Sequence, residues 1–314
     1  MVALLAVLTA ALLAGCGTVT PAAPGAALSV RSAPTVAYPV GVRTFTLDPT
    51  GARPLPVTVW YPAAATGGVA RGRFPVVVFS HGLGSLPALH APLTTRWAAA
   101  GFVVAAPAYP HTRRGAARFS RADVRNQPAD AWRLIRHLVL LGGRRGDPFA
   151  GHLDTARFAA AGHSAGGFTT AGMFTSGHPS RLRAGIVIAG GGLAGAFAGA
   201  SAPVLFVHGD ADQVVPVTVG QAAYARAPGP AAFLTVTGGD HGGYLGPTHP
   251  AFPEVLATTT NFLRWTLYND PRALPALPPP ASSPHTTWHP RNLPTPPPPP
   301  PSVDHGGVVP ALSR

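Results

Sequence analysis

An α/β fold with a doubly wound, mostly parallel sheet is the fold class that this sequence predicts. Apolar runs with the length of buried strands recur from residue 74 onward, beginning with residues 74–80 (FPVVVFS). Segments of helical character separate these runs, and this alternation is typical of a parallel sheet with helices on both faces. A third observation is the segment 159–167 (AAAGHSAGG), where an apolar strand meets a glycine-flanked serine and then a helix.

The N-terminus predicts export. Residues 1–14 are almost wholly apolar, a run too short for a spanning helix but of the length of a signal-peptide core. The run ends in residues 13–16 (LAGC), which resemble the lipobox of bacterial lipoproteins, although no Lys or Arg precedes it. The resemblance implies a signal peptide over residues 1–15, a lipid anchor at Cys16 and an extracytoplasmic location on the bacterial cell membrane. Secretion without an anchor is the alternative.

Composition narrows the range of partners. The chain has 314 residues, a net charge of +12 and 23 basic residues, all of them Arg. These are scattered along the chain, whereas a nucleic-acid-binding protein clusters them on one face, so we expect no nucleic-acid partner. Cys16 is the only cysteine, which rules out an intrachain disulfide. The sequence has no metal-binding motif of the H-E-x-x-H or paired-cysteine type, and we expect neither metal nor cofactor.

The segment before the first apolar run divides into a tether and a hairpin. Residues 16–39 carry many Pro, Ala and Gly and no periodicity, which predicts a flexible tether. Residues 42–47 and 55–61 alternate between apolar and polar side chains and are joined by the turn residues 48–51 (DPTG). They predict an antiparallel hairpin at an edge of the sheet. Pro56 fits an edge strand better than a central one.

The folded domain continues with strands and helices in alternation. Helices are predicted at residues 92–100, 128–141 and 253–268. Buried strands are predicted at residues 74–80, 102–107, 154–162, 184–189, 203–208 and, as the last, 231–237. Proline then dominates, with six consecutive residues at Pro296 to Pro301, and predicts a disordered tail over residues 271–314. The folded domain accordingly covers residues 40–270.

Residues 162–167 (GHSAGG) supply the candidate nucleophile. The pattern G-x-S-x-G between a strand and a helix is typical of a nucleophile elbow, whose tight turn strains the serine backbone and leaves room only for glycine on either side. Such a turn holds the hydroxyl of Ser164 at the carboxyl end of the sheet, with the backbone N–H of Ala165 aimed at a developing oxyanion. In a chain with 37 glycines the motif alone is a weak signal. A serine at a helix N-cap is the alternative interpretation.

A nucleophilic serine needs a base and a carboxylate that orients the base. Asp210 and Asp212 come directly after the predicted strand 203–208, and His241 follows the last predicted strand. All three candidates therefore lie at the same edge of the sheet as Ser164, where ligands bind in such folds. His249 is a second candidate for the base.

Several runs together make a family resemblance specific. Residues 79–84 (FSHGLG), 162–167 (GHSAGG), 208–216 (HGDADQVVP) and 239–241 (GDH), with the helix start 127–130 (QPAD), resemble the serine α/β-hydrolases. The nearest branch holds platelet-activating-factor acetylhydrolase, chlorophyllases, and bacterial cutinase-like and poly(ethylene terephthalate) hydrolases. The resemblance covers residues from about 42 to 268. It implies an α/β-hydrolase fold with an N-terminal antiparallel hairpin.

The resemblance also implies roles for individual residues. Ser164 is the nucleophile, His241 the general base and Asp212, in preference to Asp210, the orienting acid. The backbone N–H groups of Leu83 and Ala165 form the oxyanion hole. We expect structural roles for the remaining polar residues of these runs, namely His81, His163, His208 and Asp130.

The expected activity is carboxylic ester hydrolysis through an acyl-enzyme, on small or medium acyl esters or lipid esters. Residues 190–199 are too few for a large cap domain, so an open, shallow site is expected. The polyester hydrolases carry aromatic groups where this chain has Leu83 and glycines, and many carry a disulfide that this chain cannot form. Both departures argue against a polymeric substrate. A serine peptidase and a non-catalytic envelope-binding lipoprotein on the same fold are the alternatives.

Overall fold

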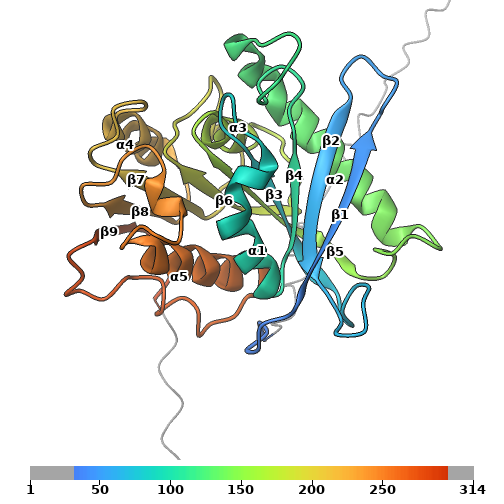
Figure 1. The fold of residues 1–314 in the computed structure, drawn as a ribbon. Coiled ribbons are helices and arrows are strands. Elements are labelled where there is room, and N and C mark those ends of the chain that lie inside the picture. The colour runs from blue at the N-terminus through green and yellow to red at the C-terminus, as the bar shows by residue number, and fades with distance from the viewer. Residues whose placement is uncertain (1–31, 296–314) are drawn as a thin grey trace, which may run out of the picture.

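The computed structural model describes residues 32–295, and within them nine strands form one sheet in the order β1-β2-β4-β3-β5-β6-β7-β8-β9 (Figure 1). Strands β3 to β8 pair in parallel, whereas β1, β2 and β9 pair antiparallel with their neighbours. The strands are β1 Val40–Leu47, β2 Leu55–Pro62, β3 Phe74–Ser80, β4 Val103–Pro107, β5 Leu153–His163, β6 Leu182–Ile188, β7 Val204–Gly209, β8 Ala231–Val236 and β9 Thr286–Arg291. The predicted hairpin is confirmed as β1 and β2.

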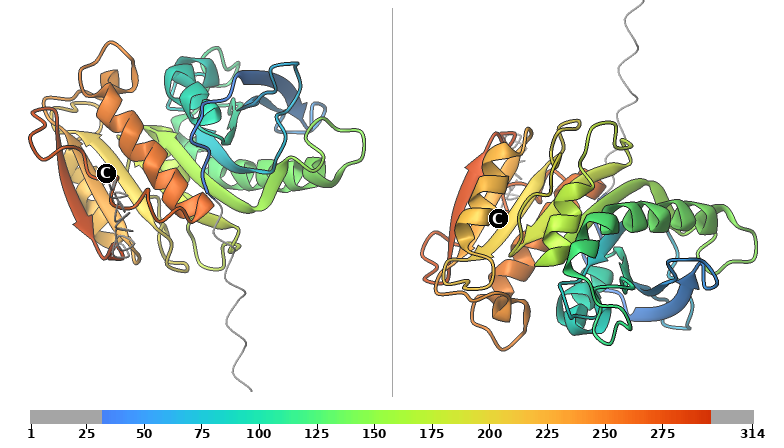
Figure 2. Two further views of the ribbon diagram at one scale, coloured as in Figure 1. Left: turned by 90° about the horizontal axis from the view of Figure 1, so that it is seen from below. Right: turned by 90° about the horizontal axis from the view of Figure 1, so that it is seen from above.

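Helices cover both faces of the sheet (Figure 2). Successive residues of β3 point to opposite faces of the sheet. Val77 packs in one buried cluster, and Val76 and Val78 pack in the other. Trp97 and Phe262, from the first and last α-helices, pack in the cluster with Val77. The α-helices are α1 Ala91–Ala99, α2 Gln127–Gly143, α3 Ala165–Gly172, α4 Val217–Arg226 and α5 Phe252–Leu263, with short 3-10 turns η1 Pro87–His90, η2 Arg121–Asn126 and η3 Gly243–Leu245 and a π turn η4 Arg264–Tyr268. The doubly wound α/β-hydrolase fold is confirmed.

A group of ion pairs fixes the hairpin to α2. Arg53 lies between the hairpin strands and donates to the carboxylates of Asp123 in η2 and Asp130 in α2, at 2.8 and 2.5 Å. Arg133, one turn further along α2, donates to Asp130 at 3.0 Å and to Asp48 of the hairpin turn at 3.2 Å. We call these five residues the Arg53 cluster. It confirms the structural role expected for Asp130.

The tail prediction is wrong for residues 271–295. These residues pack against the domain, and β9 pairs along β8 from Ala231↔Arg291 to Val236↔Thr286. Proline is compatible with this strand because β9 lies at the edge of the sheet, where a missing N–H costs no pairing on the open side. Glu254 of α5 accepts hydrogen bonds from Ser283 and Thr286, which holds the strand in place.

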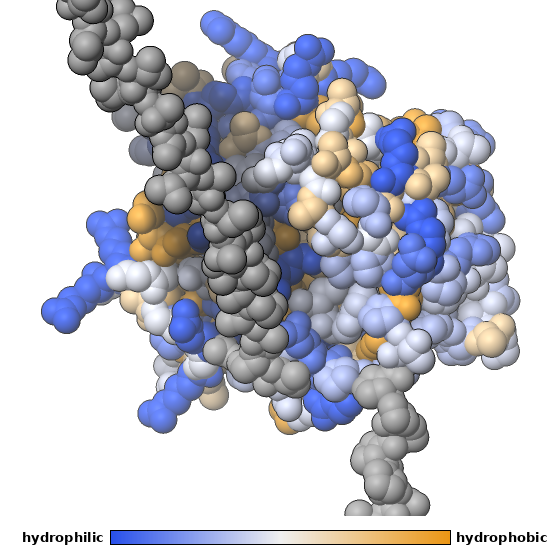
Figure 3. Space-filling view, turned by 180° about the vertical axis from the view of Figure 1, so that it is seen from behind, coloured by the Kyte–Doolittle hydropathy of each residue, from blue (hydrophilic) through white to orange (hydrophobic). Residues whose placement is uncertain are grey.

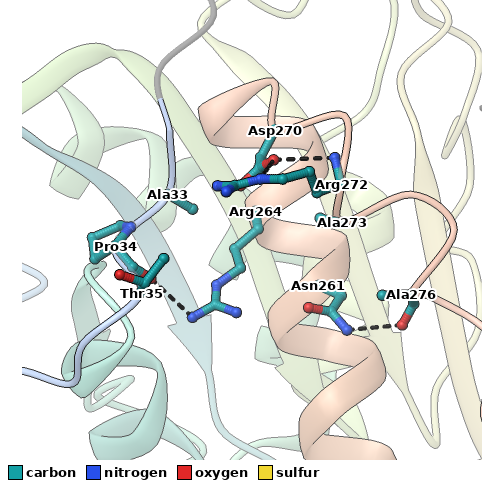
Figure 4. A pocket seen from close by; sticks show the side chains of 9 residues that line it. All are labelled: Ala33, Pro34, Thr35, Asn261, Arg264, Asp270, Arg272, Ala273 and Ala276. Atoms are coloured by element: carbon teal, nitrogen blue, oxygen red, sulfur yellow. Dashed lines mark hydrogen bonds and ion pairs between the residues drawn. The ribbon is translucent and has the colours of Figure 1, made fainter. Parts of the chain in front are cut away.

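The end of the predicted tether is also part of the domain. Ala33 is buried, and Arg264 donates to the backbone carbonyl of Pro34 at 3.2 Å (Figure 4). Residues 33–35 and Arg264 line a cavity of about 370 Å³. Asp270 and Arg272, which form an ion pair at 2.9 Å, line the same cavity. The folded part of the chain therefore begins before residue 40. Cys16 and the prolines from Pro296 onward lie outside the described residues.

Two further features bear on the site. Between β6 and β7, residues 189–203 form neither helix nor strand, which agrees with the absence of a large cap over the sheet edge. Within residues 32–295, no helix is long and apolar enough to span a membrane.

Candidate active site

The serine elbow has the geometry that its sequence predicts. Ser164 joins β5 to α3 with φ 58° and ψ −122°, a left-handed backbone conformation that costs a non-glycine residue free energy. A side chain at Gly162 would meet the backbone oxygen of Gly166 at 2.2 Å, and one at Gly166 would meet the carbonyl of Ser80 in β3. Glycine is therefore required at both positions, because only it lets strand, turn and helix approach so closely.

The structure brings Ser164, His241 and Asp212 into one hydrogen-bonded chain. The Oγ of Ser164 lies 2.8 Å from Nε2 of His241, and Nδ1 of His241 lies 2.7 Å from Oδ2 of Asp212. The three residues follow β5, β8 and β7, so strands that pair in parallel deliver them to the same edge of the sheet. With Nδ1–H donating to the carboxylate, Nε2 is the acceptor for the serine O–H.

Asp212 is buried and fully hydrogen-bonded. Its Oδ1 accepts from the backbone N–H groups of Val214 and Val215 at 2.8 and 2.9 Å, and its Oδ2 faces both His241 and, at 3.3 Å, Nε2 of His208. Burial raises the pKa of the Asp212 carboxyl, but the hydrogen bonds from His241 and the two backbone groups outweigh it and hold that pKa below its usual value. Asp212 is therefore a carboxylate at neutral pH.

The alternative candidates for the acid and the base, Asp210 and His249, form other contacts. Asp210 is exposed and accepts from the backbone N–H of Gly238 at 2.7 Å, which ties the loop after β7 to the loop after β8. His249 accepts from the backbone N–H of Ala251 at 3.1 Å, just before α5. Within the described residues neither side chain is hydrogen-bonded to Ser164 or His241, so the geometry favours Asp212 and His241.

The two expected oxyanion donors flank the serine. Ala165 is the first residue of α3, and Leu83 follows Gly82, at which an added Cβ would lie 3.0 Å from Cβ of Ser164. In the part of the chain that the structure describes, neither backbone N–H has a hydrogen-bond acceptor. Two free donors beside a serine hydroxyl can bind a negatively charged oxygen.

The three motif histidines expected to be structural bond to backbone groups. Nδ1–H of His81 donates to the carbonyl of Gly82, and its Nε2 accepts from the N–H of Tyr109. His163 donates to the carbonyl of His241 at 2.5 Å, and its ring lies 4.9 Å from the His241 ring. His208 donates to the carbonyl of Val215 at 2.8 Å. Burial lowers the pKa of His81 and of His163 to about 4, so both are neutral at pH 7.

One supporting link was not predicted from the sequence. Gln127 at the start of α2 donates to Oγ1 of Thr112 at 2.7 Å and accepts from Oγ1 of Thr169 in α3 at 2.5 Å. Thr112 in turn accepts, through its carbonyl, from the N–H of Gly84, which follows the expected oxyanion donor Leu83. The link joins the nucleophile helix to the oxyanion loop. Its only signal in the sequence is the run 127–130, which forms part of the family resemblance.

The described residues contain no group of three or more His, Cys, Asp or Glu side chains arranged to hold a metal ion. The site instead has the elements of nucleophilic catalysis, namely a hydroxyl, an imidazole, a carboxylate and two backbone donors. These groups occupy an uncapped edge of the sheet.

Comparison with protein families agrees with this geometry. The model of the PETase family, described as PET hydrolase-like, matches residues 22–246, which include Leu83, Ser164, Asp212 and His241. None of the curated proteins compared with the chain matches it. The family match spans more than half of the chain, and the family's description implies hydrolase activity. The chain therefore belongs to the PETase (PET hydrolase-like) family of α/β-hydrolases.

Proposed function

We propose that this protein is a carboxylic ester hydrolase with a Ser164–His241–Asp212 triad. The observation that carries the proposal is the hydrogen-bonded chain from Asp212 Oδ2 through His241 to Ser164 Oγ, with distances of 2.7 and 2.8 Å. Membership of a family of ester hydrolases supports the reaction class.

In the proposed reaction His241 accepts the hydroxyl proton at Nε2 while Oγ of Ser164 attacks the ester carbonyl carbon. Asp212 keeps the imidazole in the tautomer that presents Nε2 to the serine and stabilises the imidazolium. The backbone N–H groups of Leu83 and Ala165 bind the tetrahedral oxyanion. His241 then protonates the leaving alkoxide, an acyl-serine remains, and a water activated by His241 releases the carboxylic acid.

The substrates that fit best are small or medium acyl esters. The loop at residues 189–203 places no cap over the serine, and Leu83 and the glycines Gly190, Gly191 and Gly192 leave the rim without aromatic side chains at those positions. An open site accepts an ester without selecting a long chain by enclosure. Lipidation at Cys16, which would place the enzyme on the outer side of the cell membrane, remains a prediction.

Hydrolysis of 4-nitrophenyl esters from acetyl to dodecanoyl tests the proposal. Ser164→Ala should lower kcat by about 10⁴-fold or more because no other group replaces the nucleophile. Circular dichroism should show an unchanged fold. A Ser164→Ala variant that retains activity contradicts the assignment. If esters of every acyl length remain unhydrolysed but a fluorophosphonate labels Ser164, the protein is a peptidase. If Ser164 is not labelled either, it is a binding protein.

A further inference from the structure

The arginines are spread along the chain, but several of them fall in the segment that joins β4 to α2. Residues 108–126 contain five of them and a single carboxylate, Asp123, which is buried and paired with Arg53 at 2.8 Å. We call this group the arginine rim; its members are Arg113, Arg114, Arg118, Arg121 and Arg125. Among the ion pairs of residues 32–295, none includes an arginine of the rim. The rim therefore carries uncompensated positive charge.

The arginine rim lies beside the oxyanion loop. The segment leaves the carboxyl end of β4, the edge at which β5 delivers Ser164. Arg114 donates to the carbonyls of Gly84 and Ser85, through Nε at 3.3 Å and through its backbone N–H at 2.9 Å. Figure 1 places this segment at the upper edge of the molecule, and in Figure 3 strongly hydrophilic side chains lie at the upper edge, as they do at other parts of the surface.

The opposite side of the site carries negative charge. Asp210 and Asp240 are exposed in the loops after β7 and β8. In the sheet order, β5 stands two strands from β4 and two from β7. Neighbouring strands are about 4.8 Å apart, so the ends of β4 and β7 lie roughly 10 Å from the end of β5, on opposite sides, and the end of β8 lies one strand further out. The side of Ser164 toward β4 therefore carries positive charge from arginines, and the side toward β7 carries negative charge from aspartates.

Two rim arginines are free to contact a ligand. Arg118 and Arg121 are exposed, and their guanidinium groups form no hydrogen bond with the described residues. Phe119 between them is 50% exposed. A guanidinium binds a carboxylate or phosphate through paired N–H donors, and the neighbouring ring can cover an apolar linker.

We propose that the arginine rim selects anionic esters, in particular esters whose far end, beyond the scissile carbonyl, carries a carboxylate. Such substrates are the half-esters of dicarboxylic acids and the acid-terminated ends of oligoesters. The anion lies toward β4 and away from Asp210 and Asp240. This inference rests on the proposed ester hydrolase activity and assigns its substrate class.

A set of activated esters that differ only in terminal charge tests the proposal. The probes are mono-4-nitrophenyl adipate, 4-nitrophenyl hexanoate and 4-nitrophenyl 6-aminohexanoate, each corrected for its rate with Ser164→Ala. The measured quantity is the ratio of kcat/KM for the adipate to that for the hexanoate, at low and high ionic strength. The variants are Arg118→Gln/Arg121→Gln and the matched control Arg71→Gln/Arg73→Gln. The control removes the same charge from exposed residues just before β3, at the other edge of the sheet.

In the wild type the adipate should exceed the 6-aminohexanoate in kcat/KM, and salt should reduce the difference. The rim variant should lower the adipate-to-hexanoate ratio by about three- to tenfold, whereas the control should keep it. An unchanged ratio in the rim variant, or an equal fall in the control, overturns the substrate class while hexanoate hydrolysis still supports the proposed function. If no probe shows a Ser164-dependent rate, both proposals fail.

Discussion

Asp212 and Asp130 are both buried carboxylates, but their partners differ in kind. Asp130 lies between the guanidinium groups of Arg53 and Arg133. Asp212 has no arginine partner and binds backbone N–H groups and the rings of His241 and His208. The first carboxylate is neutralised by permanent cations. The second meets backbone N–H dipoles and imidazole rings instead of a guanidinium group.

This difference shows how one type of side chain serves two purposes. Around Asp130 two guanidinium groups already pair with the carboxylate, so the Arg53 cluster serves to hold α2 to the hairpin. Around Asp212 the negative charge is stabilised by dipoles, and it remains available to a proton that arrives on His241. A carboxylate that is to stabilise a transient imidazolium must not be satisfied beforehand by a permanent cation.

Removal of the Asp212 charge should have the largest effect. Asp212→Asn preserves shape but loses the acceptor that fixes the Nδ1–H tautomer, and kcat for ester hydrolysis should fall by about 10³- to 10⁴-fold. The folded structure should be retained, as judged by circular dichroism. A loss below tenfold would show that Asp212 does not serve His241 as proposed.

The buried, neutral imidazole of His81 predicts that the stability of the fold depends on pH. The pKa of His81 falls to about 4 through burial, and protonation of Nε2 would break its bond from Tyr109 N–H. The unfolded chain takes up this proton near pH 6.5, whereas the folded chain does so only near pH 4. The free energy of unfolding is therefore highest above pH 6.5 and decreases as the pH falls toward 4. The loss reaches at most about 3 kcal/mol.

Urea unfolding at pH 7.5, 6 and 5 measures this effect. The variant His81→Gln cannot titrate at this position, so its unfolding free energy should decline less steeply over the same range. Equal slopes for the two proteins would exclude His81 as a source of the acid sensitivity.

The Arg53 cluster should matter for stability rather than for turnover. Asp130→Asn leaves two guanidinium groups without their shared carboxylate and should lower the free energy of unfolding by about 2 kcal/mol. Asp48→Asn, at the exposed end of the same cluster, is the control and should cost less than about 1 kcal/mol. Per folded molecule, kcat should stay within twofold in both variants. A large fall in kcat would contradict the separation of the two carboxylates.

The parts of the molecule that the sequence predicts are those with strong local signals. Ser164 could be identified because its turn requires Gly162 and Gly166, and the parallel strands could be identified because they are buried on both faces. Helix α4 was not predicted, since it buries only Gly220 and Ala223 completely.

Other features depend on contacts between distant segments. The proline content of residues 271–314 predicts a tail, but β9 forms because its position at the edge of the sheet tolerates Pro290. Local composition cannot reveal that position. The Arg53 cluster and the Gln127 link join residues far apart in the chain, so neither has a signature in one segment.

The central claim is that the hydrogen-bonded chain makes Ser164 a nucleophile. Peptide mapping by mass spectrometry after reaction with a fluorophosphonate tests it most directly, with Asp212→Asn and Asp130→Asn treated in parallel. We predict one adduct on Ser164, formed at similar rates in the wild type and Asp130→Asn and far more slowly in Asp212→Asn. No adduct on Ser164, or equal rates in all three proteins, would contradict the account.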